Sequence, residues 1–219
     1  MEGVRAKHDF MMTWTVRLYR KYGKRILDVV LSFYALLLLA PVACLVSILV
    51  SWKLGVPSTF CQYRLGKDGR RFLLHKFRSM KTATDAQGRP LPDAERLTRF
   101  GSLLRSTSLD ELPQLLDVLR GEMSLVGPRP LLVQYRHRYT PEEWHRHDVK
   151  PGITGWAAVQ GRNALTWEKK FEYDLYYVEN YCFSLDLKIL WMTVARVYKR
   201  SGVSSDRQVT GSELRPELA

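Results

Sequence analysis

Two adjacent carboxylates with arginines on both sides are the part of this sequence best suited to chemistry. Asp110 and Glu111 lie side by side, Arg105 comes five residues before Asp110, and Arg129 stands between two prolines in the segment GPRP, residues 127–130. Carboxylates bind divalent cations, arginines bind phosphates, and an aspartate can attack phosphorus to form an acyl phosphate. Residues of these types in this order indicate phosphoryl transfer assisted by a divalent cation.

The same carboxylates also have a purely structural interpretation. Ser108 and Glu111 have the spacing of a capping box, and acids in the first turn of a helix stabilise it by about 0.3–1 kcal/mol. Pro113 suits the first turn of that helix, and Gly121 suits its end. The helix is predicted from leucines at positions 109, 112, 115, 116 and 119. Spacing alone favours the structural interpretation, whereas the nearby arginines favour the chemical one.

Other candidate residues carry weaker signals. Lys76 and Arg78 lie in the segment HKFRSM beside a predicted strand, where they are either solvated charges or phosphate ligands. His145 and His147 have no third ligand at a spacing typical of zinc, so no zinc site is predicted. The sequence contains no GxxxxGK[ST], GxGxxG, GxSxG or HExxH motif, which argues against the nucleotide-binding and hydrolytic classes that use them.

Length, net charge and cysteine content limit the number of domains, the kind of partner and the compartment that can be expected. The 219 residues suffice for one domain and one additional segment, and the net charge of +12 favours an anionic partner such as a lipid surface, a phosphorylated substrate or a nucleic acid. The three cysteines (44, 61 and 182) are far apart and odd in number. They predict no disulfide framework, and the bulk of the chain is expected in a reducing compartment.

One apolar segment predicts contact with a membrane. Residues 29–50 contain no charged side chain, and a helix of that length would cover a hydrocarbon layer of roughly 30 Å. Basic residues occur on both sides of the segment, at positions 17, 20, 21, 24 and 25 and again at 53, 64, 67, 70 and 71. The positive-inside rule places basic flanks in the cytoplasm, so two basic flanks favour a segment that enters and leaves by the same face.

Pro41 lies just past the middle of this segment and is expected to bend or break its helix. The favoured interpretation is a re-entrant helix-break-helix. The alternative is a kinked helix that spans the membrane, because proline is tolerated in such helices.

The remaining elements are predicted from hydrophobic spacing and turn residues. Two strands, at 59–63 and 71–77, flank a turn at 67–69 and predict a β-hairpin; residues 81–93 read as a surface loop. Helices are predicted at 94–105 and 131–139. Two more follow, one with Trp167, Phe171, Leu175 and Val178 on one face, the other with a stripe of Leu187, Leu190, Trp191, Val194 and Tyr198. Basic residues beside that stripe suit a helix lying in the headgroup layer, and the alternative is a helix facing the core.

These elements predict an α+β fold: a mostly helical small catalytic domain with a short β-hairpin, an N-terminal re-entrant membrane helix and interfacial amphipathic helices. The expected divisions are a basic N-terminal segment (1–25), the membrane helix (26–52), the catalytic domain (53–203) and a polar tail (204–219) that is expected to be loose.

Several blocks of sequence together resemble the small monotopic bacterial polyprenyl-phosphate phosphoglycosyl transferases, the bacterial sugar transferases that start glycan assembly. The resemblance extends in order over roughly residues 20–203, and its compact size is similar to that of the diacetylbacillosamine-phosphate transferases of protein glycosylation. It is carried by KRILDVVLSFYALLLLAP, HKFRSMK, LRSTSLDELPQLLDVLRGEMSLVGPRPLL, VKPGITGWAAVQGRN and KKFEYDLYYVEN.

The resemblance implies roles for individual residues. Asp110 and Glu111 would be catalytic and would hold Mg²⁺. The substrate-binding residues would be Arg105, Arg129, Lys76, Arg78 and Arg162. Two positions depart from the family pattern: Ala40 replaces the serine that usually precedes the membrane proline, and Ala158 replaces a glutamine, which leaves the donor sugar open.

The resulting hypothesis is an enzyme of membrane glycoconjugate biosynthesis. It would transfer a phospho-sugar from a UDP-sugar to undecaprenyl phosphate through an aspartyl intermediate and release UMP. The catalytic domain would lie on the cytoplasmic face of the bacterial inner membrane, with no nucleic-acid partner and with a second copy of the chain as a candidate partner. The alternative is a non-catalytic, membrane-tethered protein that binds nucleic acid or anionic lipid, which would be indifferent to substitution of Asp110.

Overall fold

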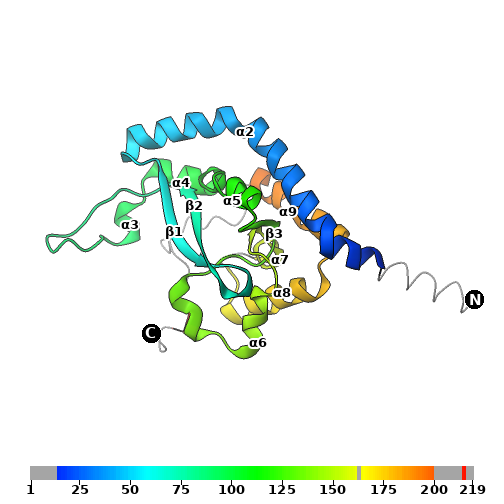
Figure 1. Cartoon of the computed structure of the whole chain (residues 1–219). Coiled ribbons are helices and arrows are strands. Elements are labelled where there is room, and N and C mark those ends of the chain that lie inside the picture. The colour runs from blue at the N-terminus through cyan, green and yellow to red at the C-terminus, as the bar shows by residue number, and fades with distance from the viewer. Residues whose placement is uncertain (1–13, 162–163, 200–213, 216–219) are drawn as a thin grey trace, which may run out of the picture.

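The computed structural model of the protein describes residues 14–161, 164–199, 214 and 215. A long N-terminal helix is joined to a domain built from short helices and two sheets of two strands each (Figure 1). Helix predominates over strand, which confirms the predicted mixture of a mostly helical domain with short sheets.

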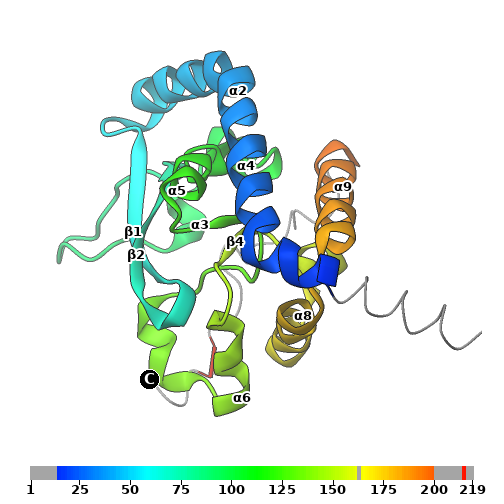
Figure 2. The same ribbon diagram turned by 45° about the vertical axis from the view of Figure 1, so that its right-hand side comes forward.

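The N-terminal helix is continuous from Trp14 to Leu54. It contains a π-helical turn, η1 (Tyr19–Gly23), followed by α2 (Lys24–Leu54), so it extends beyond both ends of the predicted range 26–52. The helical backbone continues through Pro41, and the ribbon of α2 bends strongly along its course (Figures 1 and 2). Proline removes one backbone hydrogen bond and crowds the preceding turn, which is the usual cause of such a bend.

Most of the apolar side chains of α2 face outward. Among the described residues this is the one helix long and apolar enough to cross a membrane, and only 11% of its most apolar window is buried. The exposed side chains include Val30, Leu31, Phe33, Tyr34, Leu37, Leu38, Val42, Leu45, Ile48 and Trp52. A core helix would bury such residues, so this surface is suited to contact with lipid.

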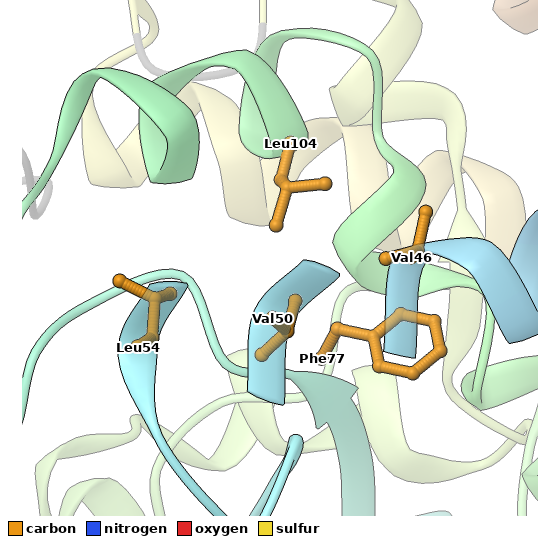
Figure 3. Close-up of a cluster of buried hydrophobic side chains, with 5 residues drawn as sticks. All are labelled: Val46, Val50, Leu54, Phe77 and Leu104. Atoms are coloured by element: carbon orange, nitrogen blue, oxygen red, sulfur yellow. The ribbon is translucent and has the colours of Figure 1, made fainter. Parts of the chain in front are cut away.

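The two halves of the bent helix contact the same domain. Near its C-terminal end, Val46, Val50 and Leu54 pack with Phe77 and Leu104 in a hydrophobic cluster (Figure 3). Near its N-terminal end, the buried carboxylate of Asp28 accepts hydrogen bonds at 3.1 Å from Ser124 Oγ and at 3.0 Å from Leu125 N. The helix is therefore anchored at both of its ends.

The first sheet is the predicted hairpin. Strands β1 (Thr59–Leu65) and β2 (Arg71–Phe77) are antiparallel, with Thr59 opposite Phe77 and Leu65 opposite Arg71. The turn between them contains the 3₁₀ helix η2 (Lys67–Gly69).

The second sheet joins distant parts of the chain. Strands β3 (Ser124–Val126) and β4 (Gly152–Thr154) are parallel, and Ser124 lies opposite Gly152. A Cβ atom on Gly152 would lie 2.1 Å from the backbone nitrogen of Gly127, so glycine is required for this approach. The loop after β3 and the segment at β4 thus meet backbone to backbone.

The helices between the two sheets differ from the prediction. The helix expected at 94–105 is split into α3 (Asp93–Arg96) and α4 (Arg99–Ser106), because Thr98 starts a new helix by accepting a hydrogen bond from Gly101 N. The predicted capping box at Ser108 is wrong: Ser108 has a left-handed backbone (φ 56°) and its side chain caps nothing. A 3₁₀ turn, η3 (Leu109–Glu111), precedes α5 (Gln114–Arg120), which ends at Gly121 as predicted.

The second half of the domain begins with short elements. The helix predicted at 131–139 is the 3₁₀ helix η4 (Val133–Arg138). It is followed by α6 (Pro141–Trp144), η5 (His145–His147) and α7 (Trp156–Gln160).

The prediction of a loose tail is wrong at two positions, since Leu214 is buried and Arg215 forms an ion pair with Glu143.

The last two helices are α8 (Trp167–Asn180) and α9 (Phe183–Lys199). Helix α8 buries Phe171, Asp174 and Tyr177. In α9 the buried residues include Asp186 and Ile189, whereas Leu187, Trp191 and Val194 are exposed. Of the predicted apolar stripe, three residues are thus exposed and Leu190 is partly buried against the core, while the side chain of Tyr198 lies outside the described part of the chain. The stripe therefore faces mainly outward, contrary to its interpretation as a core-facing stripe.

Candidate active site

The two adjacent carboxylates lie in the 3₁₀ turn η3, between α4 and α5. Both are largely buried, with 7% of Asp110 and 8% of Glu111 exposed. The left-handed backbone of Ser108 turns the chain between α4 and this pair. A non-glycine residue in that conformation costs of order 1–3 kcal/mol and is found preferentially at functional sites.

Glu111 is held by two cationic side chains from other parts of the chain. Its Oε1 atom accepts a hydrogen bond at 2.8 Å from Lys76 Nζ, at the end of β2, and one at 2.9 Å from Arg129 Nη2, in the loop after β3. The negative charge of Glu111 raises the pKa of Arg129, while burial lowers the pKa of Lys76 against the opposing effect of Glu111. Three separate segments thus meet at one carboxylate.

Asp110 has a different environment from its neighbour. Within the described parts of the chain its carboxylate has no hydrogen-bond or ion-pair partner. Burial raises its pKa, and the charge of Glu111 adds to this, while Lys76, Arg129 and Arg105 act in the opposite direction. A buried carboxylate among cations and without a bonded partner is suited to binding a metal ion or attacking an electrophile.

Arg105 approaches the same carboxylate from α4. Its Nε donates a 2.9 Å hydrogen bond to Ser79 Oγ, and the charge of Asp110 partly opposes the lowering of its pKa by burial. Helix α4 packs closely against the backbone of the segment that follows β2. A Cβ atom on Gly101 would lie 1.7 Å from the backbone oxygen of Ser79. Gly101 therefore permits the packing that brings Arg105 to the site.

The loop that carries Arg129 is itself fixed by a buried ion pair. Arg146 Nη2 donates a hydrogen bond at 2.8 Å to the backbone oxygen of Arg129 and another at 2.7 Å to Asp174 Oδ2. Both members of the pair are almost fully buried. The sequence did not predict a role for Arg146 or Asp174. Arg146 lies between two histidines, which are the residues of that segment that suggest a metal site. The one signal of Asp174 is its position on the buried face of α8.

One predicted site residue, Arg78, does not join this cluster. The nearest bonded group of Arg78 is the backbone oxygen of Leu54, 3.5 Å from Nη1, so Arg78 turns toward the end of α2. Arg162 lies outside the described residues. The structure thus brings together Asp110, Glu111, Lys76, Arg105 and Arg129 out of the seven predicted positions.

The site offers two carboxylates to a metal ion. The described part of the chain contains no group of three or more His, Cys, Asp or Glu side chains that could enclose one. Mg²⁺ is commonly held by one or two carboxylates, with water and substrate phosphates as its other ligands. The unbonded carboxylate of Asp110 beside Glu111 fits that mode of binding.

The profile of the family described as bacterial sugar transferase matches residues 19–200. A Bacillus subtilis (strain 168) protein named uncharacterized sugar transferase EpsL is 49% identical over 191 residues, which cover 87% of this chain and 95% of that protein.

Two relatives have names that state an activity. An Escherichia coli (strain K12) protein named UDP-glucose:undecaprenyl-phosphate glucose-1-phosphate transferase is 41% identical, with 78% of this chain and 39% of that protein covered. An Aeromonas hydrophila protein named UDP-N-acetylgalactosamine-undecaprenyl-phosphate N-acetylgalactosaminephosphotransferase is 36% identical, with 80% of this chain and 43% of that protein covered. The chain thus spans about two fifths of the length of these two relatives.

Proposed function

Because the chain belongs to the bacterial sugar transferase family, we propose that it transfers a sugar phosphate from a UDP-sugar to undecaprenyl phosphate and releases UMP. The carrying observation is the buried pair in which Glu111 binds Lys76 and Arg129 while Asp110 has no bonded partner among the described residues. Relatives named for this reaction support the substrates, and the differing sugars in their names leave the donor sugar to be determined.

The cations address the main obstacle to the reaction. A pyrophosphate repels an anionic nucleophile, so positive charge must be present where the phosphate oxygens lie. The side chain of Arg129 is 47% exposed even though it is bonded to Glu111, so part of this side chain is open to a ligand. Arg129, with Lys76 and Arg105, would bind the pyrophosphate beside Asp110, and Glu111 would hold the first two cations in place.

Asp110 would be the nucleophile of the first step. An oxygen of its carboxylate would attack the sugar-bearing phosphorus of the UDP-sugar, and the bond from that phosphorus to the bridging oxygen would break. UMP would leave with the electron pair, and the sugar phosphate would remain on Asp110 as an acyl phosphate. The carboxylate must be ionised to attack, which the three surrounding cations favour.

The second step regenerates the carboxylate. An oxygen of the lipid phosphate would attack the same phosphorus, and the bond between phosphorus and Asp110 would break. The product is a polyprenyl diphosphate sugar, so one phosphoanhydride replaces another. Because this exchange is nearly isoenergetic, positioning of the reactants is the main contribution of the protein.

Asp110 and Glu111 would also hold Mg²⁺. When bound, this ion would neutralise charge on the phosphate oxygens as a Lewis acid.

The anchoring of α2 supports the re-entrant arrangement. Asp28 near one end and Val50 near the other both contact the catalytic domain, through Ser124 and through Phe77 with Leu104. A straight spanning helix would place its ends on opposite sides of the membrane, where one domain could not bind both. A helix that dips into the cytoplasmic leaflet and returns would keep Asp110 at the depth of the lipid phosphate.

Asp110→Asn tests this proposal directly. UMP release is measured with a panel of UDP-sugars, undecaprenyl phosphate and Mg²⁺. We expect the variant to insert into membranes normally and to lose at least about 10⁴-fold in turnover, as expected when a covalent nucleophile is removed. Asp148→Asn, at an exposed carboxylate paired with His145, is the matched control and should retain activity.

Intact-mass measurement after incubation with the UDP-sugar alone tests the two-step route. The wild-type chain should gain the mass of one sugar phosphate, and Asp110→Asn should not. Turnover at the wild-type rate in Asp110→Asn would exclude the nucleophile, and UMP release without an adduct would argue for direct transfer.

A further inference from the structure

A second group of cations surrounds a cavity at the C-terminal end of α2. The cavity is open-sided, has a volume of about 540 Å³, and is lined by Lys53, Arg78 and Lys81 together with Leu54, Gly55 and Val56. We call it the basic pocket. Its volume lies within the range of about 300–1,000 Å³ that is usual for small-ligand sites.

Within the described residues, the charge of the basic pocket is not balanced by a carboxylate. Among the residues that the structure describes, no carboxylate pairs with Lys53, Arg78 or Lys81. Lys53 Nζ lies 5.5 Å from the ring centroid of Phe100, and Arg78 approaches only a backbone oxygen. Three like charges gathered around one cavity repel each other, and an anion between them would relieve that repulsion.

The apolar surroundings indicate that this anion carries a hydrocarbon chain. The pocket follows directly on the apolar helix, and its neighbours Trp52 and Val56 are 78% and 80% exposed. Aromatic and basic side chains together at the end of such a helix mark the depth of lipid headgroups. A ligand that lies there has its charged group in the pocket and its chain along the exposed face of α2.

The basic pocket also adjoins the catalytic cluster. Arg78 is followed in the chain by Ser79, whose Oγ accepts the hydrogen bond of Arg105 Nε. Arg105 in turn is close enough for Asp110 to act on its pKa. Only one residue of β2 and its extension, Phe77, separates Arg78 from Lys76, which bonds to Glu111. Arg78, Ser79 and Arg105 thus connect the pocket to the carboxylates.

We propose that the basic pocket binds the phosphate monoester of the acceptor lipid, and that it does so separately from the Lys76–Arg129 side of the site, which receives the UDP-sugar. This inference rests on the proposed function for the identity of the lipid. Arg78 supplies a planar donor fork for two phosphate oxygens, and the two lysines supply point charges. Separate places for the two phosphate-bearing substrates keep them from competing for the same cations.

The test is the affinity for undecaprenyl phosphate, measured by native mass spectrometry of the full chain in detergent. Lys53→Gln and Lys81→Gln should each weaken binding about fivefold, and the double variant about 25-fold, as expected for about 1 kcal/mol per lysine at a headgroup layer. Lys81→Arg should restore binding. Lys67→Gln, at an exposed lysine in the opposite end of the hairpin, is the matched control and should bind as the wild type does.

Two comparison lipids identify the source of the phosphate. Undecaprenol, which lacks the phosphate, and phosphatidylglycerol, a bulk anionic lipid, should bind equally to wild type and variants. Equal weakening for phosphatidylglycerol would overturn the proposal in favour of a general anionic-lipid contact, and unchanged affinity for undecaprenyl phosphate would overturn it altogether.

Kinetics separate this inference from the proposed function. In neutral phosphatidylcholine nanodiscs the lysine variants should raise the KM for undecaprenyl phosphate by the same factors and leave the KM for the UDP-sugar unchanged. If the wild-type chain releases UMP but the lysine variants bind undecaprenyl phosphate as tightly as the wild type, the basic pocket is refuted and the proposed function stands. Lysine-dependent lipid binding without UMP release from any UDP-sugar would refute the proposed function and leave the pocket supported.

Discussion

Asp110 and Glu111 are neighbours in sequence with different surroundings. Glu111 is bonded to two cations, and Asp110 lacks a bonded partner among the described residues. When the environments of two carboxyl groups differ in this way, the groups can take different roles. The proposed function accordingly assigns the holding of the cations to Glu111 and the nucleophilic attack to Asp110.

Removal of divalent cations should report on both carboxylates. We expect chelation by EDTA to stop UMP release and added Mg²⁺ to restore it, because the two acids resemble a site that shares the ion with substrate phosphates. In calorimetry, Mg²⁺ should raise the melting temperature of the wild-type chain by a few degrees and should not raise that of Asp110→Asn. Turnover that persists in EDTA would exclude the ion.

His147 makes a separate prediction about stability. Burial and the adjacent charge of Arg146 lower its pKa to about 4, from an ordinary value of 6.5. The unfolded chain therefore binds more protons than the folded one between these values, and stability must fall as the pH falls through this window. From pH 7 to pH 5 the loss should be about 2 kcal/mol.

Denaturation in detergent micelles at the two pH values measures this effect. His147→Gln, which does not titrate, should show a flatter dependence on pH even if it is less stable overall. His145→Gln is the matched control, since this exposed side chain lies two positions away. An unchanged slope in His147→Gln would contradict the assignment.

Among the secondary-structure elements, the loop after β3 matters most for the candidate site, because its position sets that of Arg129. The loop after β3 carries Arg129, and its position is fixed by Arg146 in η5 and Asp174 in α8. Removing one member of a buried ion pair typically costs 3–5 kcal/mol, so this pair connects stability to the placement of Arg129.

Asp174→Asn tests that connection. The substitution keeps the shape of the side chain and removes the charge that balances Arg146. We expect a lower melting temperature and about a tenfold fall in kcat, consistent with the 0.5–3 kcal/mol coupling energies of contacting residues. In an Arg129→Lys background the same substitution should lower kcat by less than twofold.

The control for this cycle is Glu172→Gln on the same helix, where the carboxylate pairs with Lys169 at the surface. It should change neither kcat nor the melting temperature. Additive effects of Asp174→Asn and Arg129→Lys would show that Asp174 does not act through Arg129.

In the molecule as a whole, both halves of one bent helix contact the domain that carries the candidate site. A buried network joins its N-terminal half to the last helices: Lys24 pairs with Asp28 and with Asp186, and Tyr19 also donates to Asp186. The opposite end is held by the hydrophobic cluster of Figure 3. The exposed apolar faces of α2 and α9 lie outside these contacts.

Labelling with a membrane-impermeant maleimide tests the resulting topology. In a cysteine-free background, Lys21→Cys before the apolar segment and Gln87→Cys after it should both resist labelling in intact cells. Both should react after permeabilisation, because the two flanks contact one domain, which the proposal places in the cytoplasm. Reaction of Lys21→Cys alone in intact cells would establish a spanning helix and exclude the re-entrant arrangement.

Local sequence determined much of this protein. The hairpin follows from strand-forming residues around a turn at 67–69, and the membrane segment follows from a long run without charges. The types of the catalytic candidates were also evident, because an acidic pair near arginines is unusual enough to single out. Each of these features depends on residues close together in the chain.

Tertiary structure alone decided how those residues are used. It replaced a capping role for Glu111 by bonds to Lys76 and Arg129, which lie 35 and 18 positions away. It placed Arg78 at the basic pocket while Lys76 bonds to Glu111, and it made Arg146 and Asp174 the support of the Arg129 loop. Contacts between distant residues depend on how the helices and strands pack, and no pattern along the chain records that packing.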